Sequence, residues 1–222
     1  MSHSINIKQK AAEIFDKVVR YREHLHQFPE LSYQEHNTMK YISEQLTSIG
    51  IPHETGVAET GIVGIIRGDH HSEGMSCIGL RADMDALPIR EENEVPYKSK
   101  KEGVMHACGH DVHSSILLGA AEILWENRNS LKQPVKLIFQ PGEEKNPGGA
   151  SLMIAAGCLN NPTVDKMYAL HVFPDLETGK TGFKEGLYMA SCDEIYITVN
   201  GKGGHGATPH QAIDSILIGA EI

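Results

Sequence analysis

The stretch CIGLRADMD, residues 77–85, indicates the fold of the chain. Its first half is largely apolar and predicts a buried strand, and two aspartates, Asp83 and Asp85, come directly after it. Helical patterns at 112–125 and 150–156 separate the later strands, so we predict an α/β fold in which helices cover both faces of a sheet. Similar apolar runs predict the other strands, at 61–66 (GIVGII), 135–139 (VKLIF) and 167–170 (MYAL).

Two helices are predicted ahead of the sheet. Apolar residues recur at three- and four-residue steps over 5–26 and again over 35–49, which is the pattern of an amphipathic helix. The second helix reaches Gly50, a residue type that commonly ends a helix in the left-handed conformation.

The character of the sequence changes near its end. From Asp193 it predicts a longer alternating strand (EIYITVNGKG), then a Gly-rich loop and a helix from about Ala212. That helix has no stop signal before Ile222. We therefore predict a first domain over residues 1–188 and the incomplete start of a second domain over 189–222.

Composition and charge exclude several classes of protein. The 222 residues include 20 Lys and Arg against 29 Asp and Glu, a formal charge of −9, so no nucleic-acid partner is expected. No run approaches the roughly 18 to 20 apolar residues that cross a membrane, and no signal peptide pattern opens the chain. These features predict a cytoplasmic protein with no membrane partner. The four cysteines form no CxxC pair, and we expect reduced thiols at Cys77, Cys108, Cys158 and Cys192.

Residue types that bind metals form four clusters, each just after a predicted strand or at the start of a predicted helix. The chain is also rich in histidine, with 13 His against 5 Phe. Because the carboxyl ends of the strands in an open α/β sheet line one crevice, we expect the clusters to converge there. The clusters are Asp83 and Asp85; His106, Cys108, His110, Asp111 and His113; Glu143 and Glu144; and His171.

The clusters supply thiolate, imidazole and carboxylate groups, which suit zinc or another late first-row divalent ion better than Mg²⁺ or Ca²⁺. At the start of a helix, Cys108 and His110 can turn toward one point. Adjacent glutamates cannot both point the same way from an extended segment, so we expect one of Glu143 and Glu144 to bind metal and the other to handle a proton. Three aspartates are left to orient the imidazoles: Asp83, Asp85 and Asp111.

Other interpretations remain open from the residues alone. Cys108, at a helix N-terminus and next to a histidine, also fits a cysteine-dependent hydrolase, but that class leaves the glutamates and His171 without a role. A third class is a non-catalytic module for metal binding or dimerisation. The Gly-rich loop 201–210 (GKGGHGATPH) lacks the Lys-Ser/Thr ending of a phosphate loop, so we interpret it as a close-approaching backbone that presents His205.

Six longer motifs resemble the metal-dependent amidohydrolases and exopeptidases that include hippurate hydrolase, N-acetyl-diaminopimelate deacetylase and the auxin-conjugate (IAA-amino acid) hydrolases. The resemblance implies a zinc-peptidase-like catalytic domain with a central mixed sheet flanked by helices, and an inserted, smaller α+β lid that mediates dimerisation. In the family's order, the motifs are RYREHLHQFPELSYQE (20–35), GLRADMDALPI (79–89), MHACGHDVHSSILLGAA (105–121), FQPGEE (139–144), ALHVFP (169–174) and VNGKGGHGATPH (199–210).

The resemblance also implies roles for the matching residues. Glu143 would be the catalytic base that deprotonates a water bridging two divalent ions and later protonates the leaving amine. His205 resembles the lid histidine that reaches the partner's active site in dimeric members and steadies the oxyanion. The implied metal ligands are Cys108, His110, Glu144 and His171.

The implied reaction is hydrolysis of the amide bond of an N-acyl amino acid, hippurate-like or N-acetyl, by a homodimer. Zinc or manganese would serve as the two ions, and nickel or cobalt are further choices in such families. Members of the family are longer, because the chain returns after the lid to complete the catalytic domain and to supply one more metal-binding histidine. We expect this chain to be the N-terminal portion of such a protein, which leaves open whether it is active alone.

Overall fold

The computed structural model describes residues 6–222 except 73 and 192, so the predicted start of the first helix at Ile5 and the predicted thiol of Cys192 lie outside the described residues. The chain divides into two units, Met1–Pro174 and Asp175–Ile222. The predicted domain boundary after residue 188 stays a prediction.

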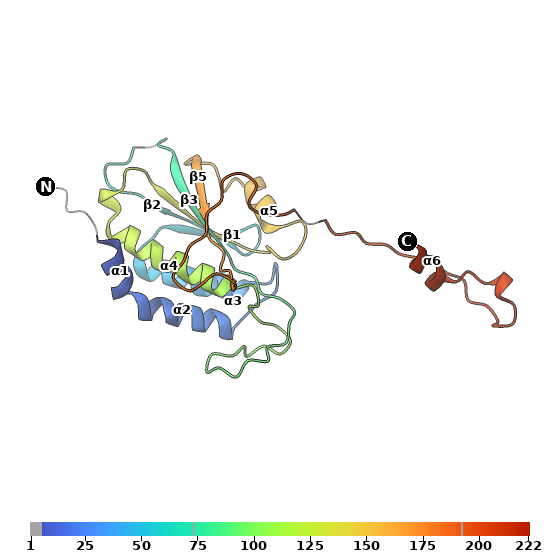
Figure 1. The fold of residues 1–222 in the computed structure, drawn as a ribbon. Coiled ribbons are helices and arrows are strands. Elements are labelled where there is room, and N and C mark those ends of the chain that lie inside the picture. The colour runs from blue at the N-terminus through green and yellow to red at the C-terminus, as the bar shows by residue number, and fades with distance from the viewer. Residues whose placement is uncertain (1–5, 73, 192) are drawn as a thin grey trace. The chain divides into compact units, whose positions relative to one another are not determined.

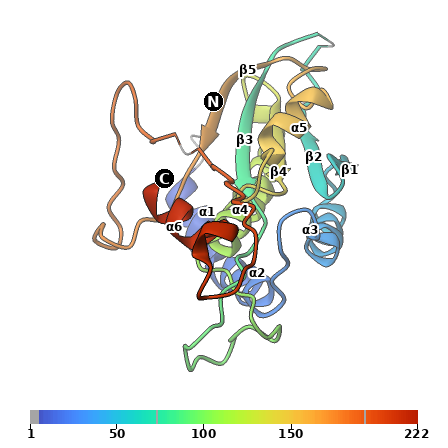
Figure 2. The same ribbon diagram turned by 90° about the vertical axis from the view of Figure 1, so that its right-hand side faces the viewer.

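The first unit is built on a five-stranded mixed sheet in the order β1-β2-β4-β3-β5 (Figure 1). β3 pairs in parallel with both β4 and β5, whereas β2 runs antiparallel to its neighbours β1 and β4. β1 and β5 form the two edges (Figure 2). The bounds are β1 His53–Val57, β2 Gly61–Ile66, β3 Cys77–Asp83, β4 Val135–Gln140 and β5 Val164–Ala169.

The strand predictions are confirmed for β2 to β5, because each has an apolar run that central or parallel strands require. β4 lies in the middle of the sheet, and every one of its residues is buried. β1 was not predicted. Its sequence, HETGV, is largely polar and its middle residues are exposed, because an edge strand with one neighbour needs few apolar residues.

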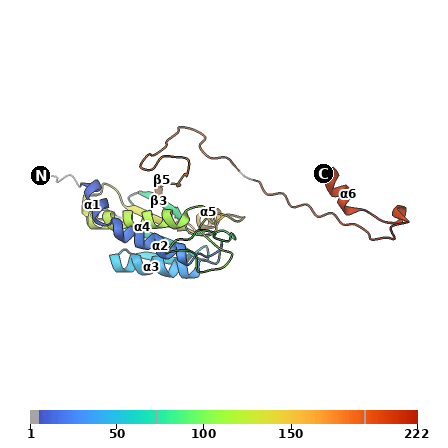
Figure 3. The same ribbon diagram turned by 60° about the horizontal axis from the view of Figure 1, so that its bottom comes forward.

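Helices α1 to α4 lie on one side of the sheet (Figure 3). Their apolar stripes close the main core over β2, β3 and β4, where Ile42, Leu118, Leu137 and Phe139 are fully buried. The predicted helix over 5–26 is broken at Ile14, which ends one helix and precedes the next. The bounds are α1 Ile7–Glu13, α2 Phe15–Gln27, α3 His36–Ile49 and α4 His110–Glu126.

The structure explains why two positions on this side of the sheet, 50 and 119, are glycine. Gly50 ends α3 with φ of 93°, so the predicted left-handed stop is confirmed. Gly119 lies in the middle of α4, where an added Cβ would meet Val18 Cγ2 at 2.6 Å. The absence of a side chain at residue 119 therefore lets α4 approach the segment of α2 that carries Val18.

The second face of the sheet carries α5 (Gly149–Ala155), whose Met153 packs with Ile138 of β4. β5 is different, because every residue after Val164 in this strand is exposed. The prediction that helices cover both faces is therefore correct around β4 and wrong at β5, where the described part of the first unit supplies no covering helix.

The second unit, Asp175–Ile222, forms a 3₁₀ turn at Pro209–Gln211 and α6 at Ser215–Glu221. α6 begins after the predicted Ala212 because the Asp214 side chain caps it, accepting hydrogen bonds from the amides of Ile216 and Leu217 at 2.9 and 3.2 Å.

The long strand predicted from Asp193 is wrong for the described residues up to 201, none of which is in a strand. A strand exists only through hydrogen bonds to a neighbour, and the described residues of this unit supply just a single bridge, between Lys202 and Ile213. The predicted α+β lid is accordingly not present in this chain as a folded sheet.

None of the helices in the described ranges combines the length and apolarity required to cross a bilayer.

A buried lysine on β4 binds the chain segment that connects α5 to β5. Lys136, 2% exposed on β4, donates from Nζ to the carbonyl oxygens of Cys158, Asn160 and Pro162 at 2.9, 2.7 and 2.9 Å. These carbonyls belong to the connection between α5 and β5. One ammonium thus satisfies three backbone acceptors of this connection, beside the apolar contacts of Cys158 and Leu159 with Ile138 and Met153.

We expect Lys136→Met to lower the free energy of unfolding by about 2 to 4 kcal/mol, because the methionine keeps the apolar stem but leaves buried carbonyls without donors. Urea denaturation followed by circular dichroism measures this change. The matched control is Lys40→Met, which removes an exposed lysine from α3 and should leave the midpoint unchanged. Equal midpoints for the two variants would contradict this role of Lys136.

Candidate metal centre

The connections between the three parallel strands pass over opposite faces of the sheet. α4 connects β3 to β4 on one face, and α5 connects β4 to β5 on the other, although β3 lies between those two strands. In open α/β sheets, ligands usually bind at the carboxyl ends of the strands where the connections change sides in this way. The segments after β3, β4 and β5 and the first turn of α4 all meet there, which confirms the predicted convergence of the four clusters.

His110, the first residue of α4, lies where these segments meet. Its Nδ1 is 2.8 Å from the carbonyl oxygen of Asp85 and 3.2 Å from the Asp85 carboxylate. Its Nε2 is buried and has no hydrogen-bond partner among the described residues. Carboxylate oxygens of Asp83, Glu144 and Glu143 lie 3.7, 3.8 and 4.0 Å from that nitrogen.

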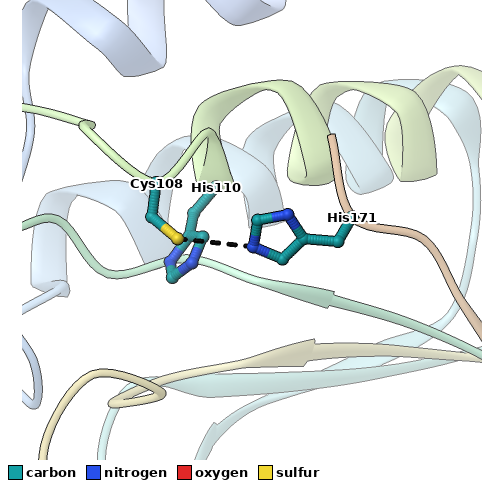
Figure 4. A group of neighbouring side chains, drawn as sticks. All are labelled: Cys108, His110 and His171. Carbon is teal, nitrogen blue, oxygen red and sulfur yellow. Dashed lines mark hydrogen bonds between the residues drawn. The ribbon is translucent and has the colours of Figure 1, made fainter. Parts of the chain in front are cut away.

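Cys108 and His171 lie beside His110 (Figure 4). Cys108 Sγ is 3.3 Å from His171 Nε2, and His171 Nδ1 is 2.7 Å from the carbonyl oxygen of Val172. Since that carbonyl can only accept, Nδ1 carries the proton and Nε2 presents a lone pair toward the sulfur and His110. One donor atom from each of Cys108, His110 and His171 lies within 4.8 Å of the others.

These residues fit a divalent metal ion. A buried imidazole nitrogen without a partner is costly in a folded protein, and an ion would satisfy it. A second group of donors, His110 with Glu143 and Glu144, shares the same imidazole and lies within the same 4.8 Å limit. Thiol, imidazole and carboxylate donors suit zinc and its neighbours in the first transition row. The ligand set Cys108, His110, Glu144 and His171 stays a prediction.

The two glutamates were predicted to point apart, and this is wrong. Carboxylate oxygens of Glu143 and Glu144 both approach His110 Nε2, because residues 143–147 form bends and a turn and not an extended segment. They differ in exposure, 41% for the Glu143 side chain and 23% for that of Glu144. Burial and the neighbouring Glu144 carboxylate raise the pKa of Glu143.

His113 uses both ring nitrogens for support. Its Nδ1 is 2.6 Å from Asp83 Oδ1, and its Nε2 accepts the amide hydrogen of Val172 at 3.0 Å. His113 therefore holds the backbone next to His171. Burial alone would raise the pKa of Asp83, but the hydrogen bond from His113 and the charge of Arg81 hold it at about 2.

Gly109, the N-cap of α4, is required between the two donors Cys108 and His110. Its φ is 85°, and an added Cβ would meet Val172 Cγ2 at 2.4 Å. A side chain at this position would push away the segment that carries His171.

Two further histidines belong to the predicted set, His106 and His205. His106 is buried, and neither ring nitrogen has a hydrogen-bond partner among the described residues. Burial lowers the pKa of His106 to about 4, so it is neutral. His205 belongs to the second unit, where its Nδ1 accepts the amide hydrogen of Ala207 at 3.1 Å. The role of His205 toward the metal centre stays a prediction.

Sequence reasoning missed a group of supporting residues at 32–35. Ser32 Oγ donates to Asp85 Oδ2 at 2.6 Å, and the same oxygen accepts the amide hydrogen of Glu144 at 2.9 Å. The motif containing Ser32 was visible in the sequence, but nothing in it shows that a segment some 50 residues before Asp85 reaches the site.

A mixed α/β sheet with thiol, imidazole and carboxylate donors at the carboxyl ends of its parallel strands is the arrangement expected of a metal-dependent hydrolase. Comparison with known proteins agrees with this class. The model of peptidase family M20/M25/M40 matches residues 79–222, and the chain belongs to that family.

Similar proteins are found in bacteria and archaea. The chain is 44% identical over 97% of its length to thermostable carboxypeptidase 1 of Saccharolobus solfataricus, covering 54% of it. It is 42% identical over 97% of its length to an N-acyl-L-amino acid amidohydrolase of Geobacillus stearothermophilus, covering 57% of it. The chain thus spans about half the length of the curated relatives it matches.

A solved structure supports the same assignment. The YXEP protein of Bacillus subtilis, described as a dinuclear metal-binding peptidase from the M20 family, superposes with a TM-score of 0.73 and 40% identity. The match covers 79% of this chain and 47% of that protein. The family resemblance drawn from the sequence motifs is confirmed.

Asp85 links the parts of the site, so its removal should weaken metal binding. We expect Asp85→Ala to raise the zinc dissociation constant about 10- to 100-fold, because His110 and the amide of Glu144 both lose a partner. Competition with a chromophoric chelator measures the constant. The control is Asp69→Ala, an exposed aspartate on another loop. Unchanged zinc affinity in Asp85→Ala would show that the carboxylate does not support the ligands.

A charged network lies behind the site. Asp111 was predicted to orient a site imidazole, but it binds His26 Nδ1 at 2.8 Å and Arg22 Nε at 2.9 Å. Successive helical residues point about 100° apart, so Asp111 points in a different direction from His110 and reaches α2. His26 Nε2 also lies 3.1 Å from Glu91 Oε1. The hydrogen bond with Asp111 raises the pKa of His26 despite its burial.

The raised pKa of His26 predicts a pH-dependent contribution to stability. The other groups facing it are the rings of Tyr97 and His106. Protonated His26 stabilises the fold fully below its unfolded pKa of about 6.5, and this contribution is lost as the pH rises through the folded-state pKa.

We expect the stability difference between the unaltered protein and His26→Gln to be larger at about pH 6 than at about pH 9. Urea denaturation at several pH values measures it. The matched control is His36→Gln, which changes an exposed histidine at the start of α3. A difference for His26→Gln that does not vary with pH would contradict the prediction.

Proposed function

We propose that the protein hydrolyses the amide bond of N-acyl amino acids with the help of bound divalent metal ions. The observation that carries this proposal is the buried, unpartnered Nε2 of His110, which faces two glutamates and lies beside Cys108 and His171. The name of the Geobacillus stearothermophilus relative supports the substrate class.

In this proposal, the residues around His110 have different roles in the reaction. Bound divalent ions supply Lewis-acid polarisation of the scissile carbonyl and activation of water. Glu143, the more exposed of the glutamates, would take the proton from the attacking water and return it to the leaving amine. Its raised pKa suits a base that must also serve as an acid. The four groups proposed to hold the two ions are Cys108, His110, Glu144 and His171.

His205 is proposed as the lid group that stabilises the oxyanion in a homodimer of the complete protein. Zinc or manganese are the proposed ions, with nickel and cobalt as alternatives to test. The cytoplasmic location predicted from the sequence belongs to the same proposal.

The cysteine-dependent alternative fits the site less well. A nucleophilic cysteine needs a lowered pKa, usually from a nearby positive charge. Burial and the carboxylates of Glu144 and Glu143 instead raise the pKa of Cys108 to about 12. A metal ligand is the use of this thiol that we favour.

The decisive test assays the complete protein, loaded with zinc or manganese, on a panel of N-acetyl, N-benzoyl and indole-acetyl amino acids, with dipeptides included because one relative is named a carboxypeptidase. Release of the free amino acid is the readout. Activity that survives thorough chelation would overturn the proposal, and metal retention without turnover on the panel would favour a binding module.

We expect Glu143→Gln to lower kcat by about 100- to 10,000-fold, because the amide cannot accept the proton of the attacking water. Metal content should stay the same, since the variant keeps the size of the side chain. The matched control is Glu59→Gln, which alters a glutamate in the turn between β1 and β2. Wild-type kcat in Glu143→Gln would exclude this residue as the base.

A further inference from the structure

The segment Ser32–Glu35 contacts the loop 142–148, which carries both glutamates of the site. The proposed chemistry uses no residue of this segment. We propose that Tyr33 and Glu35 are positioning residues for the hydrolytic reaction, and that they fix the backbone on which Glu143 and Glu144 approach His110. This inference rests on the proposed function.

Glu35 holds the beginning of the loop. It precedes α3, and its side chain is fully buried. Oε1 accepts the amide hydrogen of Gly142 at 2.8 Å, and Oε2 accepts the hydroxyl hydrogen of Thr60 at 2.6 Å. Thr60, also fully buried, lies directly before β2. A buried carboxylate thus ties the residue before Glu143 to the framework of the sheet.

Tyr33 holds the end of the loop. Its hydroxyl donates to the carbonyl oxygen of Lys145 at 2.8 Å and accepts the amide hydrogen of Gly148 at 3.0 Å. Its ring lies so close to Gly142 that an added Cβ there would meet ring carbons at 2.3 to 2.8 Å. Glycine at 142, with φ of 54°, is therefore required by the tyrosine ring as well as by the turn.

The backbone of Tyr33 supports the same conclusion. Its φ is 64°, in the left-handed region that a bulky side chain rarely adopts. Such a conformation persists only where the surroundings enforce it, and it often lies at functional sites. Here the two hydrogen bonds of the hydroxyl and the contact with Gly142 supply the enforcing interactions.

Ser32 is connected to the middle of the loop through Asp85. The Asp85 carboxylate accepts hydrogen bonds from Ser32 Oγ and from the amide of Glu144, while it also contacts His110 Nδ1. The segment therefore fixes the loop at residues 142, 144, 145 and 148, on both sides of Glu143. A small displacement of a base or ligand from its productive geometry can cost about 100-fold in rate.

The experiment uses three variants of the complete, metal-loaded protein. Tyr33→Phe removes only the hydroxyl, Glu35→Ala removes the carboxylate, and Glu35→Gln keeps an acceptor for the amide of Gly142. We expect Tyr33→Phe and Glu35→Ala to lower kcat about 10- to 100-fold with KM changed less than about two-fold, because both residues contact the loop backbone and the proposal gives them no contact with the substrate. Glu35→Gln should recover most of the activity.

A second readout is independent of turnover. Co²⁺ replaces the native ions, and its visible absorption reports the geometry and number of its ligands. We expect the spectra of Tyr33→Phe and Glu35→Ala to differ from that of the unaltered protein, and the spectrum of Glu35→Gln to match it. The control is Tyr41→Phe, which removes a hydroxyl from a tyrosine of α3 whose ring stacks on His24.

The possible failures are distinguishable. If the unaltered protein neither binds zinc nor hydrolyses the panel, the proposed function fails and this inference fails with it. If the unaltered protein is active and a folded Tyr33→Phe matches it in both kcat and cobalt spectrum, the positioning role is overturned while the proposed function stands. Circular dichroism verifies folding, and Tyr33→Phe decides the outcome if Glu35→Ala unfolds.

Discussion

Two buried carboxylates at the end of β3 hold the parts of the site together. Asp83 binds Nδ1 of His113, which in turn holds the amide of Val172 next to His171. Asp85 binds Nδ1 of His110 and the amide of Glu144. Because each imidazole gives its Nδ1 proton to a fixed partner, its Nε2 has a defined direction. The orientation of the donors toward one point follows from these contacts.

The topology of the sheet explains why these few contacts are enough to orient the donor side chains. β3 lies between β4 and β5, and the connections between these strands pass over opposite faces of the sheet. Segments that leave the three carboxyl ends are therefore neighbours, although they are separated by tens of residues in the chain. The start of α4 adds His110, and Cys108 directly before its N-cap lies at the same place. The fold gathers the donors, and the carboxylates then set their directions.

Elements with a strong local signal could be predicted from the sequence. β4 is apolar apart from Lys136 and Gln140 because it is buried on both faces, and Gly50 ends α3 as its residue type suggests. Elements whose sequence pattern is weak, or whose formation depends on distant residues, were not predicted correctly. β1 is an edge strand with a polar sequence, and the strand expected from Asp193 has no neighbouring strand to pair with among the described residues. Asp111 was expected to help orient the site imidazoles but contacts His26, because chain order does not give the direction of a helical side chain.

The fold class, the family and the donor residue types could be predicted from short stretches of the chain, because apolar periodicity and residue chemistry are local features. The partner of each donor became known from the folded protein alone. In the structure, both glutamates face His110. His113 binds the backbone amide of Val172, and Tyr33 and Glu35 form hydrogen bonds with the loop 142–148. These contacts join residues some 30 to 110 positions apart, so they depend on the packing of the whole sheet and its helices and not on any local pattern.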